Sequence, residues 1–153
     1  MRLLENRIPP PLVMLITALA MWAAAQIAPA LSIDATLRLG IAIVVAIGAG
    51  ILAISGFLAF ARAKTTVNPV KLEEASELVT TGIYQYTRNP MYLGLAALLS
   101  AWAVYLAVPW AFLGPAAFVL FTTRFQIMPE ERVLKLKFGP AYTSYQQQVR
   151  RWL

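Results

Sequence analysis

The sequence predicts an all-α fold, a polytopic membrane helix bundle with about four transmembrane helices, a cytoplasmic loop and C-terminal amphipathic helices. Two observations carry this prediction. Hydrophobic residues make up 59% of the chain and charged residues only 13%, whereas an ordinary soluble domain carries about 25% charged residues. The apolar residues also gather in three runs without a single charge, at residues 8–33, 39–61 and 89–123. One membrane domain, residues 1–153, is the simplest interpretation.

The spans follow from the lengths of these runs. About 20 apolar residues cross a bilayer as a helix, so each of the first two runs supplies one span, at residues 10–28 and 39–61. The third run is too long for one helix, and Pro109 and Pro115 lie near its middle. Because proline favours a break there, we expect a helical hairpin with spans at 91–108 and 110–128.

Two features of the first two runs have further implications. The first run follows Arg2 and Arg7, a pattern that a cleaved signal peptide shares. The second run carries several glycines, and small residues let helices approach closely in a membrane. We expect that contact on the face that bears Ala46, Gly50 and Ala53.

The distribution of basic residues predicts the orientation. With four spans both termini share a side, and that side holds all but one of the 13 lysines and arginines. Only Arg38 lies beside the opposite loop. Because cytoplasmic loops carry the excess of basic residues, we expect cytoplasmic termini. The compact chain suggests that the membrane is a prokaryotic cytoplasmic membrane. Attraction to anionic lipid headgroups explains the net charge of +6 without nucleic acid as a partner.

Cysteine and histidine are both absent. Their absence excludes disulfides and thiolate nucleophiles, and it removes the usual ligands of zinc, haem and iron. It also removes the commonest general base near neutral pH. We therefore expect no metal site, and any chemistry must proceed without a histidine.

Two polar segments flank the predicted hairpin. The loop 62–90 is longer than a simple connector, and loops of this length are usually functional. The segment 129–153 opens with Pro129, Glu130 and Glu131, residues that suit a first helical turn. Gly139 and Pro140 should end that helix, and an amphipathic stretch at 142–152 is expected to lie against the inner membrane surface. The hairpin returns the chain to the same side, so both polar segments should lie close together.

These segments carry an ordered set of motifs. The sequence reads LVTTGIY at 78–84 and RNPMYLG at 88–94, followed by Glu130 and Glu131 and by Phe138, Gly139 and Tyr142. Together the motifs resemble the isoprenylcysteine carboxyl methyltransferase and phospholipid methyltransferase superfamily of membrane enzymes. The resemblance covers roughly the C-terminal half of the chain. It implies S-adenosyl-L-methionine as cofactor, held on the cytoplasmic side, and a lipophilic or membrane-resident small-molecule acceptor that enters from the bilayer.

The resemblance also implies site residues. The cofactor site would be lined by Ser76, Glu77, Leu78, Val79, Tyr84, Asn89, Pro90, Met91, Tyr92 and Glu130. The catalytic group would comprise Arg88, Asn89, Tyr92 and Glu131. The family often has histidine at the positions of Asn89 and Ser76, and asparagine cannot titrate near pH 7. Its prenylcysteine branch places a substrate-binding arginine where this chain has Gln126, so Arg124 and Gln126 are the candidate substrate residues.

The chemistry suits these residues. In-line transfer of a sulfonium methyl needs alignment, exclusion of water and charge stabilisation rather than a strong base, provided that the acceptor is an anion or a free amine. Glu130 can pair with the cationic part of the cofactor, and the ring of Tyr84 or Tyr92 can lie against the sulfonium. The acceptor atom and the oligomeric state stay open. Two other functions remain, a nicotinamide-dependent membrane reductase of the sterol reductase type and a non-enzymatic membrane scaffold.

Overall fold

The computed structural model describes residues 5, 7–63 and 77–153, and every secondary-structure element in this part of the chain is a helix. This confirms the predicted fold class. In chain order the elements are α1 (Pro10–Ala25), α2 (Ala35–Arg62), the 3-10 turn η3 (Gly82–Gln85), α3 (Pro90–Leu106), the 3-10 turn η4 (Pro109–Phe112), α4 (Leu113–Thr122), the π-helical turn η5 (Thr123–Ile127) and α5 (Met128–Gln148).

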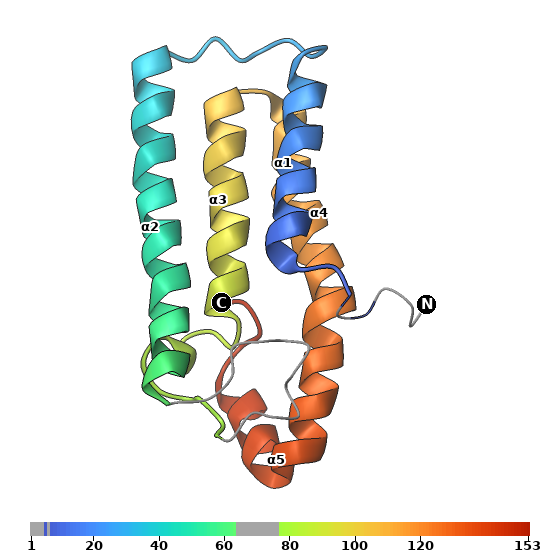
Figure 1. Ribbon diagram of the computed structural model, residues 1–153. Helices are drawn as coiled ribbons and strands as arrows, with labels where there is room; N and C mark the ends of the chain where they lie inside the picture. Colours follow the sequence, from blue (N-terminus) through green and yellow to red (C-terminus); the bar gives the residue numbers. More distant parts are fainter. Residues whose placement is uncertain (1–4, 6, 64–76) are drawn as a thin grey trace.

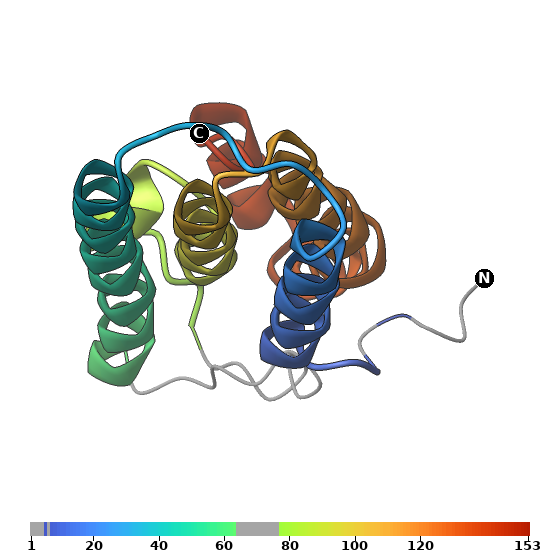
Figure 2. The ribbon, with the colours of Figure 1, turned by 90° about the horizontal axis from the view of Figure 1, so that it is seen from above.

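Helix α3 is the centre of the bundle. It lies between α2 on one side and the pair α1 and α4 on the other, as two perpendicular views show (Figures 1 and 2). The apolar core sits among α1, α3 and α4, and its buried members are Val13, Met21, Ala96, Leu99, Ala103, Val108, Ala111 and Phe118. One polar contact crosses this core, since the indole Nε1 of Trp102 donates to the carbonyl of Ala18 at 3.1 Å.

The exposed apolar surface indicates a membrane environment. Helix α2 and the continuous helical stretch Pro109–Gln148 are long and apolar enough to cross a bilayer, whereas α1 and α3 are apolar but shorter. Only 17% of the most apolar window of α2 is buried inside the protein. A core helix of a soluble protein would be mostly covered by its own chain. Exposed isoleucine, leucine and valine therefore face lipid, and the chain forms a helical membrane bundle.

The helix ends show how the sequence sets the elements. Asp34 caps α2, because its carboxylate accepts from the backbone N of Leu37 at 2.9 Å, so this helix begins four residues before the expected 39–61. The third apolar run is a hairpin, as predicted. Its turn begins where α3 ends at Leu106, since Ala107 adopts a left-handed conformation (φ 53°) and Pro109 opens η4. That each helix crosses the membrane stays a prediction.

The second helix of the hairpin does not end at the inner end of the bundle. Helix α4 continues through the π-helical turn into α5 without a loop. A backbone break then falls at Gly139 (φ 52°, ψ −122°), directly before Pro140, where the sequence predicted the helix to end. This geometry carries the glutamates at the start of α5 down from the apolar bundle and folds the rest of α5 back.

The predicted contact of small residues on α2 exists and includes Ala53 as expected, but Ala49 takes the place expected for Gly50. A Cβ built on Gly94 of α3 would lie 2.8 Å from the carbonyl oxygen of Ala49 and 3.0 Å from the Cβ of Ala53. Around Gly50, and likewise around Gly48, no described residue outside the helix's own neighbouring backbone lies within 4 Å of such an atom. Helix α2 thus turns Ala49 and Ala53 towards α3, and the glycine that matters most for the contact belongs to α3.

Candidate functional site

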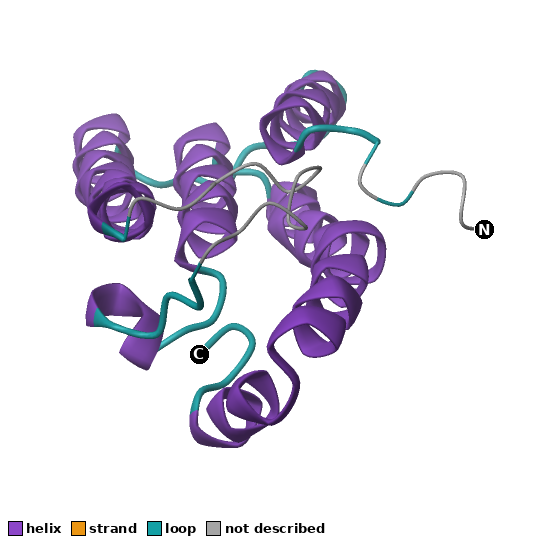
Figure 3. Cartoon of the chain, turned by 60° about the horizontal axis from the view of Figure 1, so that its bottom comes forward, coloured by secondary structure: helices purple, strands orange, loops and turns teal. Residues whose placement is uncertain are grey.

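The two polar segments meet at one end of the bundle, below α3. Seen from that end, the 3-10 turn η3, the start of α3, the helix α5 and the final residues of the chain surround a common region (Figure 3). Helix α5 and the chain before α3 are linked directly, since the Tyr145 hydroxyl donates to the carbonyl of Tyr84 at 2.7 Å. The continuous α4 to α5 helix produces this meeting, because it delivers Glu130 and Glu131 to the level of the first turn of α3.

A tyrosine and a glutamate form the innermost polar pair. The Tyr92 hydroxyl donates to Glu130 Oε1 at 2.5 Å. Pro90, at the first position of α3, fixes the start of the helix and so places Tyr92 in its first turn. The pair joins the third and fifth helices across 38 positions of sequence. Glu130 is thus held where the apolar bundle gives way to the polar end.

The environment of Glu130 changes its protonation. Burial raises the pKa of its carboxyl to about 7, the Tyr92 hydrogen bond works against this, and the neighbouring Glu131 carboxylate adds to the increase. A raised pKa means that the surroundings do not compensate the negative charge of Glu130 in full. A cationic ligand would supply that compensation, which makes Glu130 the best candidate for a cation-binding group in the site.

The raised pKa of Glu130 predicts how stability depends on pH. The folded protein holds this proton up to about pH 7, whereas an unfolded glutamate loses it near pH 4.3, so the folded state binds more protons in between. Stability should therefore fall as pH rises from about 4.5 to 7, by up to about 1.4 kcal/mol per pH unit. Melting temperatures of the ligand-free protein in detergent, measured across this range, would show the decline, and Glu130→Gln should flatten it. An unchanged slope in Glu130→Gln would contradict the assignment.

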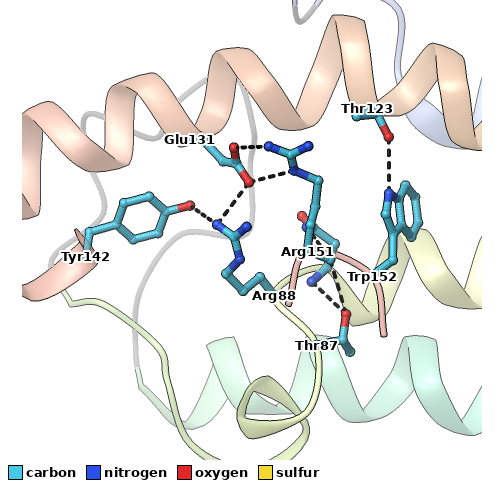
Figure 4. Close-up of polar contacts among 8 residues, drawn as sticks. Thr87, Arg88, Thr123, Glu131, Tyr142, Arg151 and Trp152 are labelled. Atoms are coloured by element: carbon cyan, nitrogen blue, oxygen red, sulfur yellow. Dashed lines mark hydrogen bonds and ion pairs between the residues drawn. The ribbon is translucent and has the colours of Figure 1, made fainter. Parts of the chain in front are cut away.

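A second polar cluster surrounds Glu131, the neighbour of Glu130 in the sequence, and is drawn in Figure 4. Arg88 Nη1 lies 3.0 Å from Glu131 Oε1. Arg151 donates to both oxygens of the same carboxylate, with Nε 2.9 Å from Oε1 and Nη2 2.7 Å from Oε2. The Arg88 and Glu131 side chains are only 10% and 13% exposed. Both oxygens of Glu131 are thus occupied by guanidinium groups. The buried Nε of Arg88 has no hydrogen-bond partner among the described residues, so this donor is available to a ligand.

Asn89 is oriented by the end of the chain. Its side-chain Nδ2 donates to the carbonyl of Arg151 at 2.9 Å, and its backbone N donates to Thr87 Oγ1 at 3.2 Å. Asn89, which stands where the family pattern often has histidine, therefore uses its side-chain nitrogen for a hydrogen bond within the protein. Its predicted catalytic and cofactor roles stay predictions.

An aromatic cluster forms the outer wall of the region. The buried residues are Val79, Tyr84, Tyr142, Tyr145 and Val149, and Leu78 packs against them. Phe60 of α2 meets the Tyr84 ring edge to face at 5.4 Å. Burial is the main cause that raises the pKa of Tyr142 to about 12 and also raises the pKa of Tyr84. The phenols are therefore neutral, and the cluster is apolar apart from its hydroxyl groups.

This cluster corrects one expectation. The apolar side of the last amphipathic stretch was predicted to lie against the inner membrane surface. Instead Tyr142, Tyr145 and Val149 are buried against Val79 and Tyr84. The apolar stripe covers the loop before α3, because the break at Gly139 folds the second half of α5 back onto that loop.

The other predicted cofactor residues lie at different distances from this centre. Pro90 is buried, and Met91 is half-buried with its side chain towards Gly56 of α2. Glu77 is exposed at the beginning of the described loop. Ser76 lies outside the described residues. Their roles stay predictions.

The predicted substrate residues face another part of the chain. Arg124 Nη1 lies 3.4 Å from Glu5 Oε1, and Arg132 pairs with the same carboxylate. Gln126 is 1% exposed, and its Nε2 donates to the carbonyl of Ile8 at 2.7 Å. Its Oε1 is buried without a partner among the described residues. Both residues thus join the π-helical turn to the segment before α1, and neither belongs to the contacts around Glu130.

The sequence interpretation missed the final residues. Arg151 pairs with Glu131, and Trp152 Nε1 donates to Thr123 Oγ1 at 3.1 Å. The basic pair followed by tryptophan had the composition of an interfacial anchor, so nothing local distinguished it. The one available signal was the pair of adjacent glutamates in the predicted site, Glu130 and Glu131, because buried carboxylates need cationic partners.

Comparison with known proteins places the chain in a family. The sequence profile of the family described as phospholipid methyltransferase matches residues 36–141, which is more than half of the chain. The chain belongs to the phospholipid methyltransferase family. It is therefore a membrane methyltransferase by descent, and the resemblance read from its motifs is confirmed. The match covers Tyr92, Glu130 and Glu131 but ends before Tyr142.

Individual relatives are consistent with this assignment. The plant "Protein-S-isoprenylcysteine O-methyltransferase B" of Arabidopsis thaliana is 35% identical over 91 residues, which is 58% of this chain and 45% of the plant protein. An uncharacterized protein of Haemophilus influenzae is 48% identical over 63 residues, 41% of this chain and all of the other. The chain thus matches less than half the length of the plant relative. No solved structure matches this phospholipid methyltransferase family member.

Proposed function

We propose that this membrane methyltransferase uses S-adenosylmethionine and transfers the methyl group to a lipophilic or membrane-resident acceptor. The observation that supports this most directly is the pair of Tyr92 and Glu130, where an uncompensated carboxylate lies at the boundary between the apolar bundle and a polar end. A water-soluble donor and a bilayer-dissolved acceptor can meet at such a boundary.

The residues present fit this cofactor. Glu130 offers a carboxylate to a cationic group, and the rings around Tyr84 offer an apolar, electron-rich wall. Arg88 Nε, which has no partner among the described residues, offers a buried donor to an anionic group. S-adenosylmethionine carries an amino group, a carboxylate and a sulfonium, so it presents both charges at once. When bound, it supplies the activated methyl group.

The chain's own residues would align and shield the reaction. Tyr92 holds Glu130 in place, and the aromatic wall keeps water from the reacting atoms. During transfer the S–CH₃ bond breaks with its electrons on sulfur, and a new bond forms to an oxygen, nitrogen or sulfur atom of the acceptor. Because no histidine is available, an anionic acceptor or a free amine suits the site best.

The distribution of charge supports the proposed orientation. Nearly all basic residues fall on the side of the site, so we place the site and both termini in the cytoplasm of a prokaryotic cell. The acceptor would reach the site laterally, from the inner leaflet of the bilayer.

The reductase alternative has less support among the described residues around Glu131. A nicotinamide dinucleotide carries phosphates that usually require several free arginines. The guanidinium groups of Arg88 and Arg151 are already paired with Glu131. A scaffold without enzymatic function would have no reason to keep Glu130 as an uncompensated carboxylate.

Isothermal titration in detergent separates these three functions. The full-length protein is titrated with S-adenosylmethionine, with S-adenosylhomocysteine and with NADPH. We expect saturable binding of the first two ligands and none of NADPH. Binding of NADPH alone would support the reductase, and folded protein that binds none of the ligands would support the scaffold.

A further inference from the structure

We propose that Arg151, in the segment 149–153 here called the tail, is a positioning residue that fixes the two halves of the site relative to each other. The inference rests on the proposed function. Helix α5 ends at Gln148, and Val149 is extended (φ −123°, ψ 130°), so the chain leaves the helix and returns towards the start of α3. Figure 4 shows the tail lying between α5 and the loop before α3.

The tail is attached to the loop before α3 through its backbone. The carbonyl of Arg150 accepts from the backbone N of Arg88 at 3.0 Å. The carbonyl of Arg151 accepts from Asn89 Nδ2 at 2.9 Å and from Thr87 Oγ1 at 3.4 Å. These bonds fix three consecutive residues that directly precede α3, and hence the helix turn that carries Tyr92.

The tail is attached to the α4 to α5 helix through its side chains. Arg151 forms a two-pronged pair with Glu131, the neighbour of Glu130. Trp152 Nε1 donates to Thr123 Oγ1 in the π-helical turn at 3.1 Å. One residue, Arg151, thus contacts the Glu130 side through its guanidinium and the Tyr92 side through its carbonyl. A five-residue segment joins both halves of the Tyr92–Glu130 pair.

Arg151 also affects the charge at Glu130. Among the described residues, the groups that act on Glu130 are Tyr92 of α3, Tyr84 of η3 and the adjacent Glu131. Glu131 disfavours the ionised form of Glu130, and Arg88 and Arg151 both offset the charge of Glu131. Removal of one guanidinium should therefore shift Glu130 further towards its neutral form.

The tail lies outside the residues that match the family profile, which end at 141. Its role therefore does not follow from family membership. It follows from the contacts that the folded chain makes between segments far apart in sequence.

The test compares two adjacent arginines in the full chain. Arg151→Met removes the pair with Glu131, while Arg150→Met changes an exposed side chain whose backbone carbonyl alone contacts the loop. The dissociation constant of S-adenosylmethionine is measured by titration calorimetry at pH 6 to 8.5. We expect about tenfold weaker binding in Arg151→Met, no more than twofold change in Arg150→Met, and partial recovery in Arg151→Lys, which keeps the charge but not the fork.

The pH profile separates positioning from plain stabilisation. In Arg151→Met the midpoint of cofactor binding should move to higher pH, because Glu130 ionises later when Glu131 is less compensated. A lower melting temperature with an unchanged dissociation constant and midpoint would overturn the inference, and so would equal losses in both methionine variants. If Arg151→Met does not fold, Arg151→Lys against Arg150→Lys decides in the same way. Failure of the wild-type protein to bind the cofactor would instead overturn the proposed function.

Discussion

Replacement of Glu130 by glutamine is expected to weaken the binding of S-adenosylmethionine about 100-fold, which corresponds to about 2.7 kcal/mol. Glutamine keeps the size and the acceptor oxygen that Tyr92 contacts, but it removes the negative charge. Burial already raises the pKa of this carboxyl to about 7, so a cationic ligand gains a strong interaction when it draws Glu130 into its ionised form. Titration calorimetry at pH 8, where wild-type Glu130 is ionised, measures the loss.

A matched control is Glu5→Gln. Glu5 also lies at this end of the bundle, but its carboxylate pairs with Arg124 and Arg132 rather than with the tyrosine of α3. The same chemical change there should leave cofactor binding within about twofold of wild type. If Glu130→Gln binds as tightly as wild type, the cofactor's cation does not lie at Glu130.

Replacement of Gly94 by alanine is expected to destabilise the protein by about 3 kcal/mol. The added methyl group would lie 2.8 Å from the carbonyl oxygen of Ala49 and 3.1 Å from the backbone N of Ala53. These are backbone atoms of α2, so no side chain can move aside and the two helices must separate. Because α2 packs chiefly against α3, a large drop in melting temperature should follow in detergent.

The control for this prediction is Gly48→Ala on the partner helix. Within the described part of the chain, no atom beyond the helix's own neighbouring backbone lies within 4 Å of the new methyl group. Alanine is also the better helix former. Its melting temperature should equal or slightly exceed that of wild type. Equal melting temperatures for Gly94→Ala and Gly48→Ala would show that α2 and α3 do not meet at Gly94.

Much of this fold can be predicted from the sequence because the uncharged apolar runs that indicate membrane helices are long. A run such as 39–61 can only be a membrane helix or a buried one, whatever its neighbours do. The hairpin also follows, since Pro109 sits where a chain of that length must turn. The grouping of Tyr92 with Glu130 follows in turn, because a hairpin returns both polar segments to one end.

Other features depend on contacts that the sequence does not record. Ala49 and Gly50 of α2 are adjacent, so they point in directions that differ by only a fraction of a helical turn. Because both residues are small, composition cannot show which of them faces α3. The tail is a second example. Arg151 reaches Glu131 only because α5 breaks at Gly139 and the chain turns back after Gln148, and the sequence predicts the break but not the return.

The substrate residues illustrate a third case. Arg124 and Gln126 were predicted from the position of a substrate-binding arginine in the prenylcysteine branch of the family, and their role stays a prediction. The π-helical turn Thr123–Ile127 changes the direction of these side chains relative to Glu130. They contact Glu5 and the carbonyl of Ile8 instead.

The central claim is that this protein transfers a methyl group from S-adenosylmethionine to a membrane-resident acceptor. The most direct measurement incubates membranes that contain the protein with methyl-labelled S-adenosylmethionine and follows the label into an organic extract. We predict label in the organic phase with the wild-type protein and background levels with Glu130→Gln. Organic-phase label at the same level in both, or wild-type protein that binds the cofactor yet transfers nothing to any extracted lipid, would contradict the account.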